Sequence, residues 1–236
     1  MEFVGSFSGG PPVLKKFQIG EAMATNGVPV VVGGAGNEGV ALAATTTASD
    51  LVGVTAKIQA TLLTAQQTDN SDPARLVTVV VNPDAMYRAR LSGGATSGTD
   101  LTALTVTTAS TDGLTVSVSG TDFSSPTQDE GTVYCITGAN AGVSRKITSV
   151  ADGAATVTLA FPNDIAVGDT FFTVPFAPGE DQFVQLTTTL DELDASVAVD
   201  TDNNNFRVIE LDLNGVGDSY ATVVPFDCIW AAGGSI

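Results

Sequence analysis

The chain contains no histidine, and this absence excludes several kinds of catalytic and metal-binding site. A Ser-His-Asp or Cys-His nucleophile cannot be built, nor a zinc site with histidine ligands, nor an imidazole switch near neutral pH. The two cysteines, Cys135 and Cys228, are too few for a four-thiolate metal site or for a disulfide scaffold in 236 residues. Each is expected to be a small buried apolar residue. No cofactor is predicted.

Basic residues are scarce as well. Nine Lys and Arg stand against 26 Asp and Glu, which gives a formal net charge of −17. Because contacts to phosphates need clustered cations, nucleic acid is not an expected partner. No apolar run reaches the length of a membrane span and the N-terminus does not resemble a signal peptide, so we expect no membrane association and assembly in a reducing cytoplasm. With 43% hydrophobic residues, the chain can bury a sizeable core.

What the sequence does contain is a series of short β-branched runs separated by turn residues. This pattern predicts an all-β fold of small β-barrel or sandwich modules with hairpins and little helix. Pro29 lacks an N–H and is therefore expected at a strand start or sheet edge. The segment Asp191–Val199 is the best candidate for a helix, and it is weak. In the stretch beginning at Leu114, apolar and polar residues alternate as in a half-buried strand.

The arrangement of these runs suggests an insertion. We expect residues 206–230 to pair with Tyr87–Leu91, with a β-bulge between Val208 and Ile209 that restores the apolar alternation. The predicted division is an N-terminal arm at 1–16, a β-rich domain at 17–91 plus 179–236, and an inserted barrel or sandwich module at 92–178. Two domains in series are the alternative.

The arm is rich in Gly, Ser and Pro, and shows neither helical nor strand periodicity. We expect it to become ordered only against a partner, by adding a strand to a neighbouring subunit, so that deleting residues 1–14 would barely change the melting temperature. A tail without a role is the alternative. The candidate contact residues are its large apolar side chains and the two lysines at its root: Phe3, Val4, Phe7, Val13, Leu14, Lys15 and Lys16.

Arg88 and Arg90 are two residues apart, on one face of a predicted strand. In a chain this acidic, such a pair is expected either to bind carboxylates of the same chain or to form an interface patch for an acidic neighbour. Both interpretations stay open, and both arginines are candidate contact residues.

Three stretches could carry chemistry, but each fits a structural role better. Gly138–Gly142, followed by Arg145 and Lys146, could cradle an anion, yet a hairpin turn is favoured because no phosphate-loop context surrounds it. Asp200–Asn205 spaces oxygens like a calcium loop but lacks the glycine and the final glutamate. The carboxylates of Asp191, Glu192 and Asp194 lack the aromatic platforms of a glycosidase. The sequence therefore predicts no enzyme and no metal site.

Several segments nevertheless resemble one known family. The runs Lys16–Gly20, Thr25–Val31, Gly39–Ala43 and Asp50–Val54 are similar to the capsid cement, or head decoration, proteins of tailed bacteriophages, with the order of an entry Gly, an "NGVPVV" turn and strand, a "GVALA" strand and a "GV" strand. Val81–Leu91 and Gly138–Ser149 also resemble parts of larger phage structural proteins. The resemblance covers about two-thirds of the chain, and its motifs are turns and strands rather than catalytic groups.

The resemblance implies a virion protein on the outer surface of an icosahedral capsid, bound to the major capsid protein, as a homotrimer over subunit junctions. The acidic charge and the absence of catalytic groups agree with this role. The alternative is a tail-fibre or receptor-binding β-module that recognises host surface carbohydrate. A bacterial surface-layer or adhesin domain is a third interpretation, for which a secretion signal and clearer calcium loops would be expected.

Overall fold

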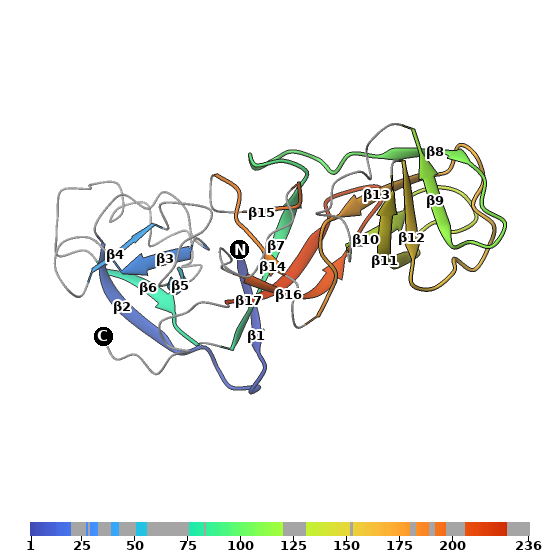
Figure 1. Ribbon diagram of the computed structural model, residues 1–236. Coiled ribbons are helices and arrows are strands. Elements are labelled where there is room, and N and C mark those ends of the chain that lie inside the picture. The colour runs from blue at the N-terminus through green and yellow to red at the C-terminus, as the bar shows by residue number, and fades with distance from the viewer. Residues whose placement is uncertain are drawn as a thin grey trace.

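The structure is a computed structural model, which describes residues 1–19, 27, 29–32, 39–42, 51–55, 76–82, 84–119, 131–151, 153–179, 183–188, 192–196 and 206–225. Within these ranges the fold is all-β and contains no helix, as the sequence predicts. The strands form two closed barrels and one open sheet. Figure 1 shows the open sheet between the two barrels.

The first barrel closes in the order β2-β4-β3-β5-β6. Its β2–β4 pair is parallel and its other pairs are antiparallel. Pro29 is the first residue of β3, where its missing N–H is tolerated, and this confirms its predicted position. The strands are β2 (Leu14–Ile19), β3 (Pro29–Val32), β4 (Gly39–Leu42), β5 (Leu51–Thr55) and β6 (Leu76–Val80).

The central sheet is assembled from parts of the chain that lie far apart, in the order β1-β7-β17-β16-β14, and β15 pairs with β7 in parallel. The expected pairing of 206–230 with Tyr87–Leu91 is confirmed, because Tyr220 to Val223 face Arg90 to Tyr87. The strands are β1 (Glu2–Ser6), β7 (Ala85–Ser92), β14 (Phe183–Val184), β15 (Leu193–Asp194), β16 (Phe206–Asp212) and β17 (Tyr220–Pro225).

The β-bulge predicted in β16 is also confirmed, since the register to β17 shifts between Val208 and Glu210. After the shift, Glu210 is exposed while Ile209 and Leu211 are partly buried. The bulge therefore absorbs the slip in the apolar pattern and keeps one face of the strand against the protein.

The second barrel is a closed six-stranded antiparallel barrel with the order β10-β11-β12-β9-β8-β13. Its core contains Val116, Ile147 and Phe171, none of which is exposed. All its strands lie between residues 104 and 174, while the division of the chain into domains stays a prediction. The strands are β8 (Leu104–Thr108), β9 (Thr115–Val118), β10 (Thr132–Cys135), β11 (Ser144–Ala151), β12 (Ala154–Val157) and β13 (Thr170–Val174).

Three expectations from the sequence are wrong. Residues 1–16 are not an arm without strands, because Glu2–Ser6 pairs with β7 of the same chain and Leu14–Ile19 pairs with β6. The weak helix candidate at Asp191–Val199 contains β15 in its described part, where pairing with β7 overrides the local propensity. Leu114, expected on a buried face, lies just before β9 and is 37% exposed.

Candidate protein-binding surface

The N-terminal strand is fixed to the protein at its beginning. The amino group of Met1 donates a hydrogen bond to the Gly27 carbonyl oxygen over 2.9 Å. Phe3 faces Tyr87 across the β1–β7 ladder, and the two rings meet edge to face with centroids 6.1 Å apart. Phe3, expected to contact a partner, thus packs partly buried against the core of the central sheet.

The loop between β1 and β2 is held against the turn that precedes β7. The N–H of Phe7 donates to the Asp84 carbonyl over 3.2 Å, and the N–H of Ser8 donates to Asp84 Oδ2 over 3.0 Å. At the other end of the loop, the N–H of Val13 donates to Asn82 Oδ1. The hydrogen bonds from Ser8 lower the pKa of the Asp84 carboxyl below its ordinary value. Both ends of the loop are therefore anchored.

The segment made of β1, this anchored loop and the first residue of β2 presents apolar side chains to solvent. Among the described residues eight large apolar side chains are exposed, and four of them lie in the stretch 4–14. We call these four the N-terminal apolar surface: Val4 (49% exposed), Phe7 (57%), Val13 (51%) and Leu14 (53%). Exposed apolar groups that gather on one ordered segment are typical of a protein-binding surface. Lys15 follows directly and is exposed, and Lys16 lies opposite Thr78 in β2.

The two candidate arginines of β7 bind carboxylates of the same chain, which is the first of their two predicted roles. Arg88 Nη2 lies 2.7 Å from Asp212 Oδ2, and its guanidinium stacks 3.7 Å from the ring centroid of Tyr220. One nitrogen of this guanidinium binds a carboxylate and one of its faces packs on an aromatic ring, so Arg88 has partners within its own chain.

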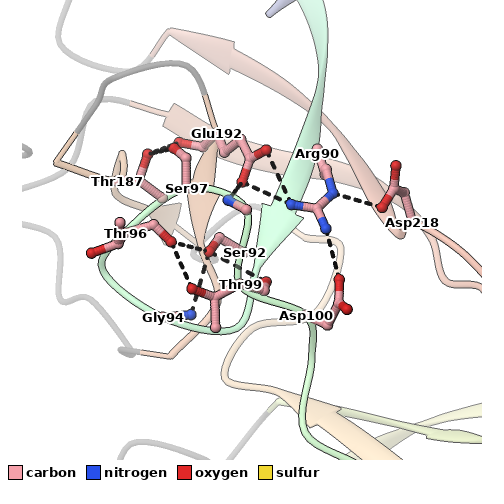
Figure 2. A network of polar contacts seen from close by, with 11 residues as sticks. Arg90, Ser92, Gly94, Thr96, Ser97, Thr99, Asp100, Thr187, Glu192 and Asp218 are labelled. Atoms are coloured by element: carbon pink, nitrogen blue, oxygen red, sulfur yellow. Dashed lines mark hydrogen bonds and ion pairs between the residues drawn. The ribbon is translucent and has the colours of Figure 1, made fainter.

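Arg90 binds three carboxylates, as Figure 2 shows. Its Nε donates to Asp218 Oδ1 over 2.7 Å, its Nη2 to Asp100 Oδ1 over 2.8 Å, and its Nη1 to both oxygens of Glu192 over 3.1 Å. The carboxylate of Asp218, and next that of Glu192, raise the pKa of the Arg90 guanidinium. The network ties β7 to three other segments, so its evident role is structural.

The carboxylate cluster considered for catalysis does not converge on a common point. Asp194 is fully buried in β15, where Oδ1 accepts hydrogen bonds from the N–H and hydroxyl of Ser196 and Oδ2 from Gln185. Glu192 is held by Arg90 and by the N–H of Gly98. Asp191 lies outside the described residues. The two carboxylates that can be placed are therefore occupied by internal partners.

The other two candidate motifs have different outcomes. Gly138–Gly142 joins β10 to β11 as a hairpin turn, which confirms the favoured interpretation. Gly138 has a φ of 93°, and a Cβ there would collide with the Asp169 carboxylate. Residues 200–205, whose oxygens are spaced like those of a calcium loop, lie outside the described residues. Cys135 is buried as expected, and Cys228 also lies outside.

A groove of about 590 Å³ lies where the central sheet meets the second barrel. Its apolar lining includes Leu101, Ile136 and Phe172, and its polar lining includes Arg90 with two of its partners, Asp100 and Asp218. Sequence reasoning missed this groove, because it is formed by turns that meet only after the sheet and barrel have formed. Sequence reasoning also did not single out Asn82 and Asp84, although polar side chains at a turn are a signal for anchoring a neighbouring loop.

No protein-family model, no curated protein and no solved structure matches this chain. Within the described ranges, no group of three or more acidic or cysteine side chains is placed to hold a metal ion. The part of the chain that the structure describes also has no helix long and apolar enough to cross a membrane.

Proposed function

We propose that this chain is a structural virion protein that binds the outer surface of a phage icosahedral head and stabilises the shell by bridging major capsid subunits. The observation that carries the proposal is the N-terminal apolar surface, which extends from β1 over the anchored loop to the first residue of β2. A loop that is already ordered loses little conformational entropy on binding, so exposed side chains on it can contribute directly to affinity.

The charge of the chain supports the outer face of the shell rather than its DNA-filled interior. With a net charge of −17, the protein is repelled by DNA phosphates. It is not proposed to be an enzyme. The chain is proposed to act as a homotrimer, since a protein above a threefold junction of subunits must match that symmetry.

The structure changes which of the candidate residues we propose as contacts. Phe3 packs inward, and Arg88 and Arg90 bind carboxylates of their own chain. The proposed shell contacts are therefore the four residues of the N-terminal apolar surface together with Lys15 and Lys16.

The alternative function, carbohydrate recognition at a tail fibre, would use the groove between the sheet and the second barrel. Among the described residues that line this groove, the one aromatic residue is Phe172, which is only 4% exposed. Sugar sites usually offer an exposed aromatic face, which Phe172 does not provide. The N-terminal apolar surface therefore supports shell binding more strongly than the groove supports carbohydrate binding.

The test is binding to undecorated phage heads, followed by sedimentation of the heads and quantification of bound protein. Phe7→Asp should reduce binding about tenfold or more, because a charge would have to be buried in an apolar contact. Val167→Asp is the matched control, since Val167 is 64% exposed but lies next to the second barrel, and it should bind as the unmodified chain does. Equal binding by both variants would overturn the proposed contact, and absence of binding by the unmodified chain would overturn the proposed function.

A further inference from the structure

A second surface that combines apolar and basic side chains lies at one edge of the second barrel. Three strand ends meet there, because the N–H of Val157 donates to the Leu114 carbonyl and the N–H of Thr158 donates to the Lys146 carbonyl. Leu159 and Leu114 are 64% and 37% exposed. We call the residues at these strand ends the barrel-edge patch, which consists of Leu114, Arg145, Lys146 and Leu159. Arg145 is half-buried on the core side of β11, whereas Lys146 is exposed on its outer side, as Leu159 is beyond β12.

The two cations of the patch bind no carboxylate in the described structure. Among the described residues, Arg145 donates to backbone carbonyls, from Nε to Ala160 over 3.1 Å and from Nη1 to Ser144 over 2.8 Å, and its guanidinium lies 5.4 Å from the ring centroid of Phe161. Lys146 is exposed and forms no ion pair with a described residue. An exposed cation that binds no carboxylate of its own chain is free to pair with an acidic group of a second molecule.

One carboxylate does lie close to the patch. Asp112 accepts hydrogen bonds from the hydroxyl of Ser110 over 2.7 Å and from the N–H of Leu114 over 3.0 Å. These bonds lower its pKa, so it is charged at neutral pH. The patch therefore keeps an excess of one positive charge.

The groove between the central sheet and the second barrel is complementary to the barrel-edge patch, because it combines negative charge with an apolar lining. Arg90 and its three carboxylates together carry two negative charges. Asp100 is 90% exposed and Asp218 is 49% exposed, so both are available at the groove beside its apolar lining. An occupant with exposed apolar side chains and a positive charge would match this groove.

The patch and the groove are built from different residues of the chain and share none. The groove touches Ile136, which follows β10, and Thr170 and Phe172 of β13, and β10 and β13 are neighbours in the barrel. The patch lies at the ends of β11, β12 and β9, of which β11 pairs with β10. A contact between two such different surfaces is heterologous, and it generates a ring when the rotation between copies closes.

We infer that the barrel-edge patch of one copy docks into the groove of a second copy, with Lys146 near Asp100 and Leu159 against the apolar lining. This inference rests on the homotrimer in the proposed function and specifies the surfaces that hold it together. It leaves the N-terminal apolar surface available for the shell.

The experiment measures the mass of the purified full chain in solution by sedimentation equilibrium over a range of concentrations. The unmodified chain should associate beyond 23.9 kDa. Lys146→Glu and Asp100→Lys should each weaken association about tenfold or more, since each places like charges opposite one another. The double variant should regain association, because the substituted glutamate then faces the substituted lysine.

Glu210→Lys is the matched control for Asp100→Lys. It makes the same change in net charge at an exposed site of β16 outside the groove, and it should associate as the unmodified chain does. The inference is overturned if the unmodified chain stays monomeric up to about 1 mM, which is the weak limit of specific affinities. It is also overturned if Lys146→Glu associates normally or if the double variant does not recover. Because no phage heads are present, these results are independent of whether the chain binds a shell.

Discussion

The second barrel and the central sheet are both antiparallel β-structure around a buried core, yet the chain builds them in different ways. The barrel takes all its strands from one stretch, 104–174, whereas the central sheet joins strands from Glu2 to Pro225. Closing long loops costs entropy before any contact is gained, so local assembly is favoured kinetically. We therefore expect the barrel to form early and the central sheet to form late.

The two regions also differ in their use of charge. The ion pairs that join described residues all involve Arg88 or Arg90 of β7, in the central sheet. The barrel instead closes one end with amide hydrogen bonds, in which Asn140 Nδ2 donates to the Asn163 carbonyl and the Asn163 N–H donates to Asn140 Oδ1, both over 3.0 Å. Segments of the central sheet that are distant in sequence are thus joined by specific ionic contacts. The second barrel, whose strands are close in sequence, is held by turns and packing.

The largest expected effect comes from a matched pair of substitutions, one in the core of the second barrel and one in the core of the central sheet. Phe171 in the barrel and Phe206 in the central sheet are both fully buried. Changing either to alanine should lower the free energy of unfolding of its own region by about 3–5 kcal/mol, through lost burial and a residual cavity. Hydrogen exchange should show lost protection in the barrel strands for Phe171→Ala and in β7, β16 and β17 for Phe206→Ala.

Cys135 provides an independent measure of barrel opening. Its side chain is fully buried, so alkylation requires the barrel to open, and burial, and next the charge of Asp169, raise the pKa of the thiol to about 11. In a Cys228→Ser background, labelling should accelerate strongly with Phe171→Ala and little with Phe206→Ala. Equal acceleration by both would mean that the two regions unfold as one unit.

The same contrast between local and distant strand pairing explains how much of the fold could be predicted from the sequence. Local signals were sufficient for the all-β class, for Pro29 at a strand start and for the bulge after Val208, because each depends on a few neighbouring residues. The strand at Glu2–Ser6 was missed because its partner β7 lies some 80 residues away. Only the pairing shows that this short Gly-containing segment is a strand, since β-structure depends on its neighbours more than on intrinsic propensity.

The candidate surface was predictable in part. The apolar residues of the N-terminal segment were identified from composition, since a Gly-rich stretch cannot bury them by itself. Their division into Phe3, which packs inward, and Phe7, which is exposed, follows from the β1–β7 ladder and the anchoring at Asp84. The groove and the barrel-edge patch depend entirely on which strand ends meet, and this is a property of the tertiary structure.

The second-largest expected effect concerns the contribution of β1 to the free energy of unfolding of the central sheet. Deleting residues 1–6 removes the β1–β7 ladder and exposes Tyr87, and it should lower the free energy of unfolding by about 2 kcal/mol. Because residues 1–14 include β1, the expectation from the sequence that deleting them barely changes the melting temperature is replaced as well. Thermal unfolding followed by circular dichroism measures the difference, with Val4→Ser as a control that should stay within about 0.5 kcal/mol. An unchanged melting temperature of the truncated chain would show that β1 is dispensable.

A smaller effect is expected from the ionic contacts that distinguish the central sheet. Arg90→Lys keeps the charge but loses the planar arrangement of donors that serves three carboxylates, and it should cost about 1–2 kcal/mol. Arg88→Lys should cost less, about 0.5 kcal/mol, because Arg88 is more exposed and has a single carboxylate partner. Urea unfolding at low and high salt measures both. Equal costs would mean that the three-carboxylate network adds nothing beyond one exposed pair.

The smallest expected effect concerns the anchor of the N-terminal loop at Asp84. Hydrogen bonds from Ser8 lower the pKa of this carboxyl from its ordinary 3.8, so the folded state favours the ionised form. The resulting stability is therefore fully present above pH 3.8 and is lost as the pH falls through the lower, folded-state pKa. Ser8→Ala removes the side-chain hydrogen bond, which is the largest cause of the shift, but keeps the backbone N–H. The Asp84 midpoint, followed by carboxyl-carbon NMR, should rise toward 3.8 without reaching it. If the midpoint were the same in both chains, the Ser8 hydroxyl would play no part in holding the loop that presents Phe7.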